Sequence, residues 1–157
     1  PLTSTQPFPL AVSSSVWMSF QDGSVVTRTP VTAGDGGPAL CLDVKPGPSH
    51  WMAVEIVLDV DALRSCGGAT LALQAAAAPR IQVTAVLRVP VTGDRPFSDS
   101  PPHRLVLDAT MRTHATFFTL PDVTIAPNPA CPSPRLVVLL PLREISLYLR
   151  SLTFGPA

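Results

Sequence analysis

A long alternating stretch in the middle of the chain, residues 80–90, constrains the fold more than any other part of the sequence. Apolar residues occupy every second position, and these are Ile81, Val83, Ala85, Leu87 and Val89. The positions between them hold Gln82, Thr84, Val86 and Arg88. Alternation with a period of two is typical of a strand with one buried face. Pro90 ends the run, because proline cannot donate a ladder hydrogen bond. The stretch therefore predicts a long strand in mid-chain.

Shorter runs of the same kind predict further strands on both sides of this one. They cover residues 16–20, 24–29, 39–44, 52–60, 70–78, 103–108, 115–120, 136–140 and 145–154. The four alanines of residues 75–78 have high helix propensity, but the alternation of Leu71 and Leu73 before them favours a strand. Residues 61–68 allow at most one helical turn. We expect an all-β fold, a two-sheet antiparallel β-sandwich with about ten strands.

Local signals predict how some of these strands are joined. Asp22 and Gly23 form a turn signal, which predicts a hairpin between residues 16–20 and 24–29. In the last strand the apolar positions change phase after Arg150, and a β-bulge at Arg150 and Ser151 would restore the register. Residues 136–140 are apolar on both faces, which is typical of a central strand or of a strand at an interface.

Composition limits the domain organisation and the class of protein. A chain of 157 residues predicts one domain, which we place at residues 16–157 after a loose arm, rich in Pro, Ser and Thr, at residues 1–15. Only 14% of the residues are charged, where roughly 25% is usual, while 46% are hydrophobic; this excludes a disordered chain. No apolar run reaches the roughly 20 residues of a membrane-spanning helix. The first residue is Pro1 rather than Met, so we expect a processed protein or a domain of a longer one.

Charge and cysteine usage exclude further classes. Eleven basic and eleven acidic residues cancel, and no basic stripe of the kind that binds nucleic acid is present. The three cysteines form no C-x-x-C motif, which argues against a disulfide framework and a zinc site. Cys41 lies within an apolar run and is expected to be a buried, inert thiol. We therefore expect no metal site, although Asp22-Gly23 and Asp35-Gly36-Gly37 offer either turns or oxygen ligands for a structural Ca²⁺.

The order of the predicted strands resembles that of jelly-roll carbohydrate-binding modules of the family-four and family-nine type. The similarity lies in the series of residues 37–44, 52–58, 69–75, 81–89, 104–108, 117–120 and 145–154. Those modules carry an acidic pair in the last strand, where this chain has Arg150 and Ser151. Their usual Trp after a Leu-Thr segment is replaced by the region of Met111 to His114. The resemblance therefore implies the fold more than sugar binding, since fold does not settle function.

Residues suited to hold a sugar are few. Pyranose rings bind to aromatic faces, with polar side chains fixing the hydroxyls, and the chain is only 6% aromatic. The candidates are Trp51, Gln74, Gln82, Arg88 and Tyr148. For Trp51 the alternative is a role in the core, which is also our expectation for Trp17. For the others the alternative is an ordinary solvated sheet face, and Gln74, Gln82, Thr84 and Arg88 are expected on neighbouring strands.

Catalytic residues are harder to find. Glu55 and Glu144 are the only glutamates, and nothing in the sequence brings them to the roughly 5–10 Å separation of a glycosidase pair. His50, His103 and His114 are scattered, and the G-x-S-x-G motif is absent. The chain is accordingly expected to lack catalytic residues, although this leaves its status as an enzyme open.

Three functions remain, in order of preference. The first is a non-catalytic carbohydrate- or glycan-binding module of a larger or processed protein, which needs no cofactor. The second is a structural or assembly domain with a protein partner or a second copy as its partner, suggested by the two-faced residues 136–140. The third is a polysaccharide-active hydrolase or lyase. Neutral charge and a single lysine agree with a secreted or cell-surface setting.

Overall fold

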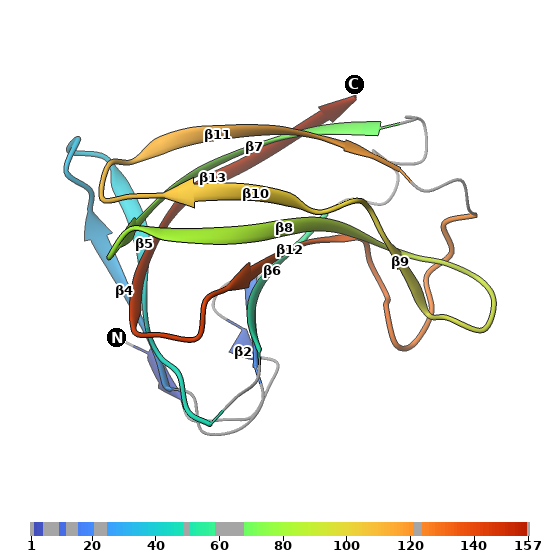
Figure 1. The fold of residues 1–157 in the computed structure, drawn as a ribbon, viewed down its shortest axis with the longest axis horizontal. Helices are drawn as coiled ribbons and strands as arrows, with labels where there is room; N and C mark the ends of the chain where they lie inside the picture. The colour runs from blue at the N-terminus through green and yellow to red at the C-terminus, as the bar shows by residue number, and fades with distance from the viewer. Residues whose placement is uncertain are drawn as a thin grey trace.

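The protein forms two antiparallel β-sheets that face each other (Figure 1). The computed structural model describes residues 2–4, 10–11, 16–20, 25–48, 51–58, 68–120 and 124–156. All of its regular elements in these segments are strands, so the predicted all-β sandwich is confirmed. No helix among these residues is long and apolar enough to cross a membrane.

Sheet A has six strands in the order β1-β4-β5-β13-β7-β11. Their bounds are β1 Leu2–Ser4, β4 Val25–Thr32, β5 Pro38–Lys45, β13 Ile145–Pro156, β7 Gly68–Ala78 and β11 Arg112–Thr119. The last strand of the chain, β13, lies between β5 and β7, so the C-terminal segment holds the two halves of this sheet together.

Sheet B has seven strands in the order β10-β8-β12-β6-β3-β2, with β9 pairing beside β8. Their bounds are β10 His103–Leu107, β8 Ile81–Pro90, β12 Arg135–Leu140, β6 Met52–Val57, β3 Val16–Phe20, β2 Leu10–Ala11 and β9 Phe97–Asp99. Strand β12 pairs with β6 on one side and β8 on the other. Residues 136–140 are therefore a central strand. They have no free edge at which a protein partner could pair, so this reason for expecting such a partner is not supported.

The core between the sheets is built from the predicted inward positions of the strands. All five apolar residues of the mid-chain alternation are buried, from Ile81 at 2% exposure to Val89 at 0%. The largest fully buried side chains come from both sheets: Phe118, Leu42, Met52, Leu71, Ile81, Leu87, Leu107 and Leu147. Burial of such side chains is the main favourable contribution to folding.

The predicted β-bulge lies where the sequence placed it. The pairing of β13 with β7 shifts register between Leu149 and Ser151, so Arg150 is the extra residue. Leu149 pairs with Ala75 before the shift, and Leu152 pairs with Leu73 after it. A bulge places two residues of one strand opposite one residue of its neighbour, so that Leu152 and Phe154 are opposite Leu73 and Leu71 of β7 in the register.

Three local predictions were wrong or differ from the structure. Residues 16–20 and 25–32 do not form a hairpin, because β3 pairs in sheet B and β4 in sheet A; a turn signal shows where the chain bends but not which sheet the next strand joins. Residues 2–4 and 10–11, expected in a loose arm, pair with β4 and β3. Consecutive strands β7 and β8 lie in different sheets rather than side by side. The expected turns at residues 21–24 and 61–67 lie outside the described residues.

Candidate functional site

The candidate residues are divided between the two outward faces of the sandwich. Gln82 and Arg88 lie on β8 in sheet B, whereas Gln74 and Tyr148 lie on β7 and β13 in sheet A. The expectation that Gln74 and Gln82 share one face was therefore wrong, because the chain crosses from one sheet to the other between β7 and β8. The structure thus presents two surfaces, each with its own set of polar side chains.

On sheet B, Arg88 is held in a fixed position by two neighbours. Its Nε and Nη2 atoms donate to the two carboxylate oxygens of Asp99, at 2.8 and 2.9 Å. Its guanidinium also stacks over the ring of Phe97, 3.9 Å from the ring centroid. The hydrogen bonds that Arg88 donates to Asp99 raise the pKa of Arg88 above its ordinary value. Bidentate pairing and stacking are the geometries that suit arginine to planar recognition of polar groups.

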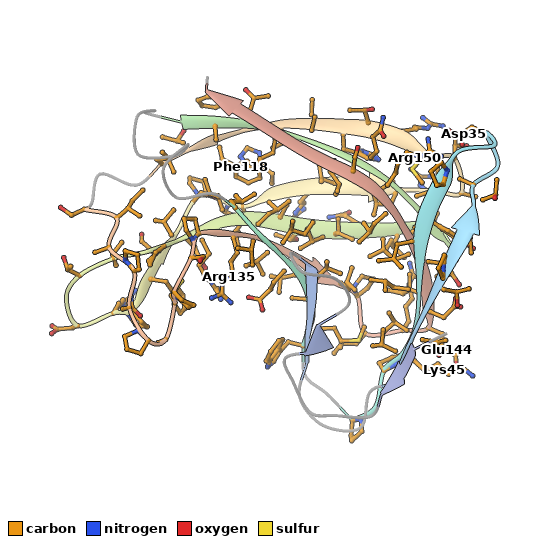
Figure 2. The ribbon with its side chains drawn as sticks, turned by 180° about the vertical axis from the view of Figure 1, so that it is seen from behind. Asp35, Lys45, Phe118, Arg135, Glu144 and Arg150 are labelled. Carbon is orange, nitrogen blue, oxygen red and sulfur yellow. The ribbon has the colours of Figure 1, made fainter. Side chains whose placement is uncertain are left out.

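A second arginine lies on the neighbouring strand. Arg135 on β12 is opposite Arg88 in the register of the sheet. Its Nη1 donates to Oε1 of Glu55 at 3.3 Å, and its Nη2 contacts Sγ of Cys131 at 3.9 Å. Glu55 is only 8% exposed, and a buried carboxylate of this kind needs a charged partner. Figure 2 shows Arg135 on the outer side of sheet B, whereas Phe118 lies between the sheets.

Apolar side chains surround these charged pairs. Ala53, Val86 and Val137 form a small buried cluster that is separate from the main core. Val57 and Leu139, on the same strands as Ala53 and Val137 and two or four residues away, are exposed at 37% and 41%. This outward face therefore combines rigid polar pairs with apolar contact area, and we call it the sheet B face, defined by Arg88, Asp99, Phe97, Arg135, Glu55, Val57 and Leu139.

On sheet A, Tyr148 lies among polar residues of the neighbouring strand β5. It is opposite Cys41 in the register, and burial, followed by the nearby Cys41, raises the pKa of its hydroxyl. Burial likewise raises the pKa of the Cys41 thiol to about 11. Cys41 is 4% exposed, which confirms the expected buried thiol, and a protonated thiol is a poor nucleophile. Cys41 and Cys131 are both free.

Several other polar side chains of sheet A form hydrogen bonds with each other. Oγ of Ser146 donates to Oδ1 of Asp43 at 2.5 Å. Gln74 accepts a hydrogen bond from Oγ of Ser151 at 3.0 Å and donates to Oγ1 of Thr113 at 3.3 Å. These contacts explain Gln74 as a residue that links three strands of sheet A, so its binding role stays a prediction.

The two tryptophans lie at or near sheet B. Trp51 is half-buried immediately before β6, a position consistent with either of its two predicted roles. Trp17 is on β3, opposite Glu55 in the register; nothing further of its side chain is described. Gln82 is exposed on β8.

Sequence reasoning did not identify Asp99, Arg135 or Phe97 as site residues. Asp99 and Phe97 lie on β9, in a part of the chain where the sequence predicts no strand, and they reach Arg88 only because β9 pairs with β8. Arg135 and Glu55 are 80 residues apart in the sequence. The available signal was an arginine within one apolar strand, Arg88, and another directly before the apolar residues 136–140, Arg135, but the partners of both depend on strand pairing.

The catalytic and metal candidates are not brought together. Glu55 is bonded to Arg135, while Figure 2 shows Glu144 near Lys45 and away from Arg135. Among the described residues, no three His, Cys, Asp or Glu side chains gather as a metal ion would need. The Asp35 carboxylate is bonded to Arg150 at 2.5 and 2.6 Å. Asp22 and Gly23 lie outside the described part of the chain.

Comparison with known proteins finds similarity in the fold but not in the sequence. No protein-family model matches the sequence, and no curated protein is significantly similar to it. Solved structures are similar to it in fold. A family-four carbohydrate-binding module has a TM-score of 0.58 at 18% identity, over 84% of this chain and 91% of that one. A family-eleven module from Clostridium thermocellum, in complex with a β-1,3-1,4-mixed-linked tetrasaccharide, has a TM-score of 0.62 at 7% identity, over 92% and 91%.

A third solved structure agrees with these two. The N-terminal cellulose-binding domain of a Cellulomonas fimi β-1,4-glucanase has a TM-score of 0.56 at 17% identity, over 83% of this chain and 88% of that domain. The predicted resemblance to jelly-roll carbohydrate-binding modules is therefore confirmed at the level of the fold.

Proposed function

We propose that this chain is a non-catalytic carbohydrate-binding module, and that the sheet B face holds the glycan. The observation that supports it best is the placement of Arg88 opposite Arg135, each fixed by a carboxylate, on a face that also holds exposed Val57 and Leu139. Sugar rings present hydroxyl groups at their edges and C–H groups on their faces, so a binding surface needs rigid polar groups next to apolar area.

The rigidity of the polar groups favours binding. An arginine that is already bonded to Asp99 and stacked on Phe97 loses little side-chain entropy when a ligand arrives. The pairing also leaves the face without a large excess of either charge, which suits a neutral polysaccharide better than an acidic one. The similar structures support the same class, since they include modules named for carbohydrate and cellulose binding.

The larger setting of the module belongs to the same proposal. We place the chain as an accessory part of a larger or processed protein in a secreted or cell-surface setting, where polysaccharides are found. Trp51 and Gln82 are proposed to contribute to the glycan site from sheet B, while Gln74 and Tyr148 lie on the other face and are not part of it.

The test is a binding titration with neutral glycans. Native affinity electrophoresis on a panel of soluble polysaccharides, including mixed-linked β-1,3-1,4-glucan and β-1,4-glucans, would identify a ligand, and calorimetry would give its affinity. Replacing both members of one pair, Arg88→Ala with Asp99→Ala, avoids an unpaired charge and should weaken binding at least about tenfold, roughly 1.4 kcal/mol. Arg112→Ala, an exposed arginine on β11, should leave the affinity unchanged.

Two results would refute the proposal. Retention by no polysaccharide of a broad panel would remove the glycan-binding function. Equal affinity of the wild type and the Arg88→Ala, Asp99→Ala variant, with both folded by circular dichroism, would remove the sheet B face as the site.

A further inference from the structure

We infer that a hollow on the outward face of sheet A is a second binding site, which takes a neutral sugar ring. The hollow has a volume of about 540 Å³, within the roughly 300–1,000 Å³ that is usual for ligand pockets. It lies between the loop that joins β4 to β5 and the loop that joins β10 to β11, above strand β7. Because sheet A is on the opposite side of the core, this site is separate from the sheet B face.

Small side chains make the floor of the hollow and an aromatic ring makes one wall. Ala76 and Ala78 are two residues apart on β7, so both point outward. Tyr148 lines the hollow from β13, where it is opposite Ala76 in the register, and Met111 lines it from the other loop. A surface of methyl groups beside a tyrosine ring and a thioether matches the C–H face of a pyranose.

The polar groups of the hollow are neutral as a set. Asp35 is the only charged residue of the lining, and its carboxylate is bonded to Arg150 and to the backbone N–H of Gly37. Thr32 and Thr110 add hydroxyl groups at the rim. A charged ligand would lose hydration here without gaining an opposite charge, whereas the hydroxyls of a sugar find both donors and acceptors.

Both walls are fixed before a ligand arrives. In the β4–β5 loop, the N–H of Ala33 donates to the carbonyl of Gly37 at 2.8 Å, and Nε of Arg150 donates to the carbonyl of Pro38 at 3.1 Å. In the β10–β11 loop, the N–H of Thr110 donates to Asp108 at 2.9 Å. A preformed pocket binds with a smaller entropic cost than one that must be ordered.

The ligand class of this site rests on the proposed glycan-binding function, but the site can be tested separately. Amide chemical shifts of the labelled protein are followed by NMR while cellobiose, xylobiose, lactose or maltose is added to about 50 mM, which covers millimolar affinities. We expect at least one of these neutral disaccharides to give saturable shifts at Ala76, Ala78 and Thr110.

Matched variants decide where the sugar binds. Ala78→Phe fills the hollow from an exposed position and should abolish these shifts or weaken binding at least about tenfold. Ala115→Phe makes the same change on exposed β11 outside the hollow and should leave binding unchanged. Tyr148→Ala, which removes the ring without filling the hollow, should also weaken it. The sheet B variant Arg88→Ala, Asp99→Ala should retain binding in the hollow.

Each failure has its own signature. No saturable shift at the hollow with any of the four sugars overturns the second site, and so does tighter binding there of galacturonate or phenol, since the hollow would then not select a neutral sugar. Shifts confined to β8, β9 and β12 would support the sheet B face and overturn the hollow. Shifts confined to the hollow would support the hollow and overturn the sheet B face as the sugar site.

Discussion

The pair of Asp35 and Arg150 shows how a single contact fixes a loop at one end of sheet A (Figure 2). Arg150 can approach the loop backbone because Gly37 has no side chain: a Cβ atom there would lie 2.7 Å from the Arg150 guanidinium. Gly36 has a φ of 84°, a left-handed conformation that glycine adopts without strain. Two glycines and one ion pair therefore set the shape of the β4–β5 loop.

The ion pair predicts a pH dependence of stability. The Arg150 hydrogen bond, with that of Gly37, holds the pKa of Asp35 well below its usual value near 3.9. A carboxyl whose folded pKa is depressed stabilises the protein above its unfolded pKa and loses this contribution as the pH falls. We expect the stability difference between the wild type and Asp35→Asn to be constant from about pH 8 to pH 5 and to shrink at more acidic pH.

Urea unfolding at a series of pH values measures this difference. Arg150→Gln removes the other partner of the pair. The loss of stability in the double variant should therefore be no larger than the sum of the losses in the two single variants. The difference between that sum and the loss in the double variant is the coupling energy of the pair, and it should vanish in acid. A stability difference that stays the same down to about pH 2 would contradict the assignment of the shift to this pair.

At the scale of residues, orientation was predictable and partners were not. Alternation correctly placed Arg88 on the outward face of β8, and Tyr148 on that of β13, because a period of two is a property of the strand alone. The partners of Arg88, which are Asp99 and Phe97, come from a short strand that has no alternating pattern of its own. Such contacts follow from pairing between strands, which a single sequence does not specify.

Strand β11 gives a matched comparison at the scale of one element. Adjacent residues of a strand point to opposite faces, and here Phe118 is 1% exposed while Phe117 is 50% exposed. Phe118 also meets the ring of His103 edge-on, with the centroids 4.8 Å apart. The same residue type on one strand therefore fills the core at one position and meets solvent at the next.

Alanine substitutions at these two positions should differ strongly in their effect. Phe118→Ala removes a buried ring and leaves a cavity, for a loss of about 3–5 kcal/mol in the free energy of unfolding. Phe117→Ala should change it by about 0.5 kcal/mol or less, as is usual for surface positions. Chemical denaturation of both variants measures the difference, and similar losses at the two positions would show that the register of β11 is wrong.

Local signals predicted the elements better than they predicted their neighbours. The bulge at Arg150 was visible because a phase change in the apolar pattern has a structural cause within one strand. The hairpin at Asp22 and Gly23 was wrong because β3 pairs with β6 and β4 pairs with β5, and these two pairs lie in different sheets. Sheet membership depends on contacts across the whole chain rather than on the turn.

At the scale of the whole molecule, the fold could be predicted from the order of the strands. The apolar pattern predicted a two-sheet sandwich, and the resemblance in strand order predicted its jelly-roll type. Solved carbohydrate-binding modules at 7–18% identity are similar to the chain in fold. Buried positions are constrained by packing in any sandwich of this type, so their pattern persists where the sequence does not. The polar residues on the outward faces carry no such constraint, which is why the candidate sites had to be found from the structure.

The position of the two proposed sites on opposite sides of the core has a consequence for polymers. Packed sheets are about 10 Å apart, and side chains on both outer surfaces add to this, so one short oligosaccharide cannot reach both sites. A module with one site coats a polysaccharide, whereas a module with two opposed sites acts as a cross-linker that ties two chains together.

Light scattering of a mixture with a polysaccharide that the protein binds tests this consequence. With the wild type, scattering should rise at intermediate ratios of protein to polysaccharide and fall again in an excess of protein, when every polysaccharide chain is saturated. Ala78→Phe should still bind but scatter no more than the free polymer, and scattering equal to that of the wild type would show that the hollow takes no part in joining chains.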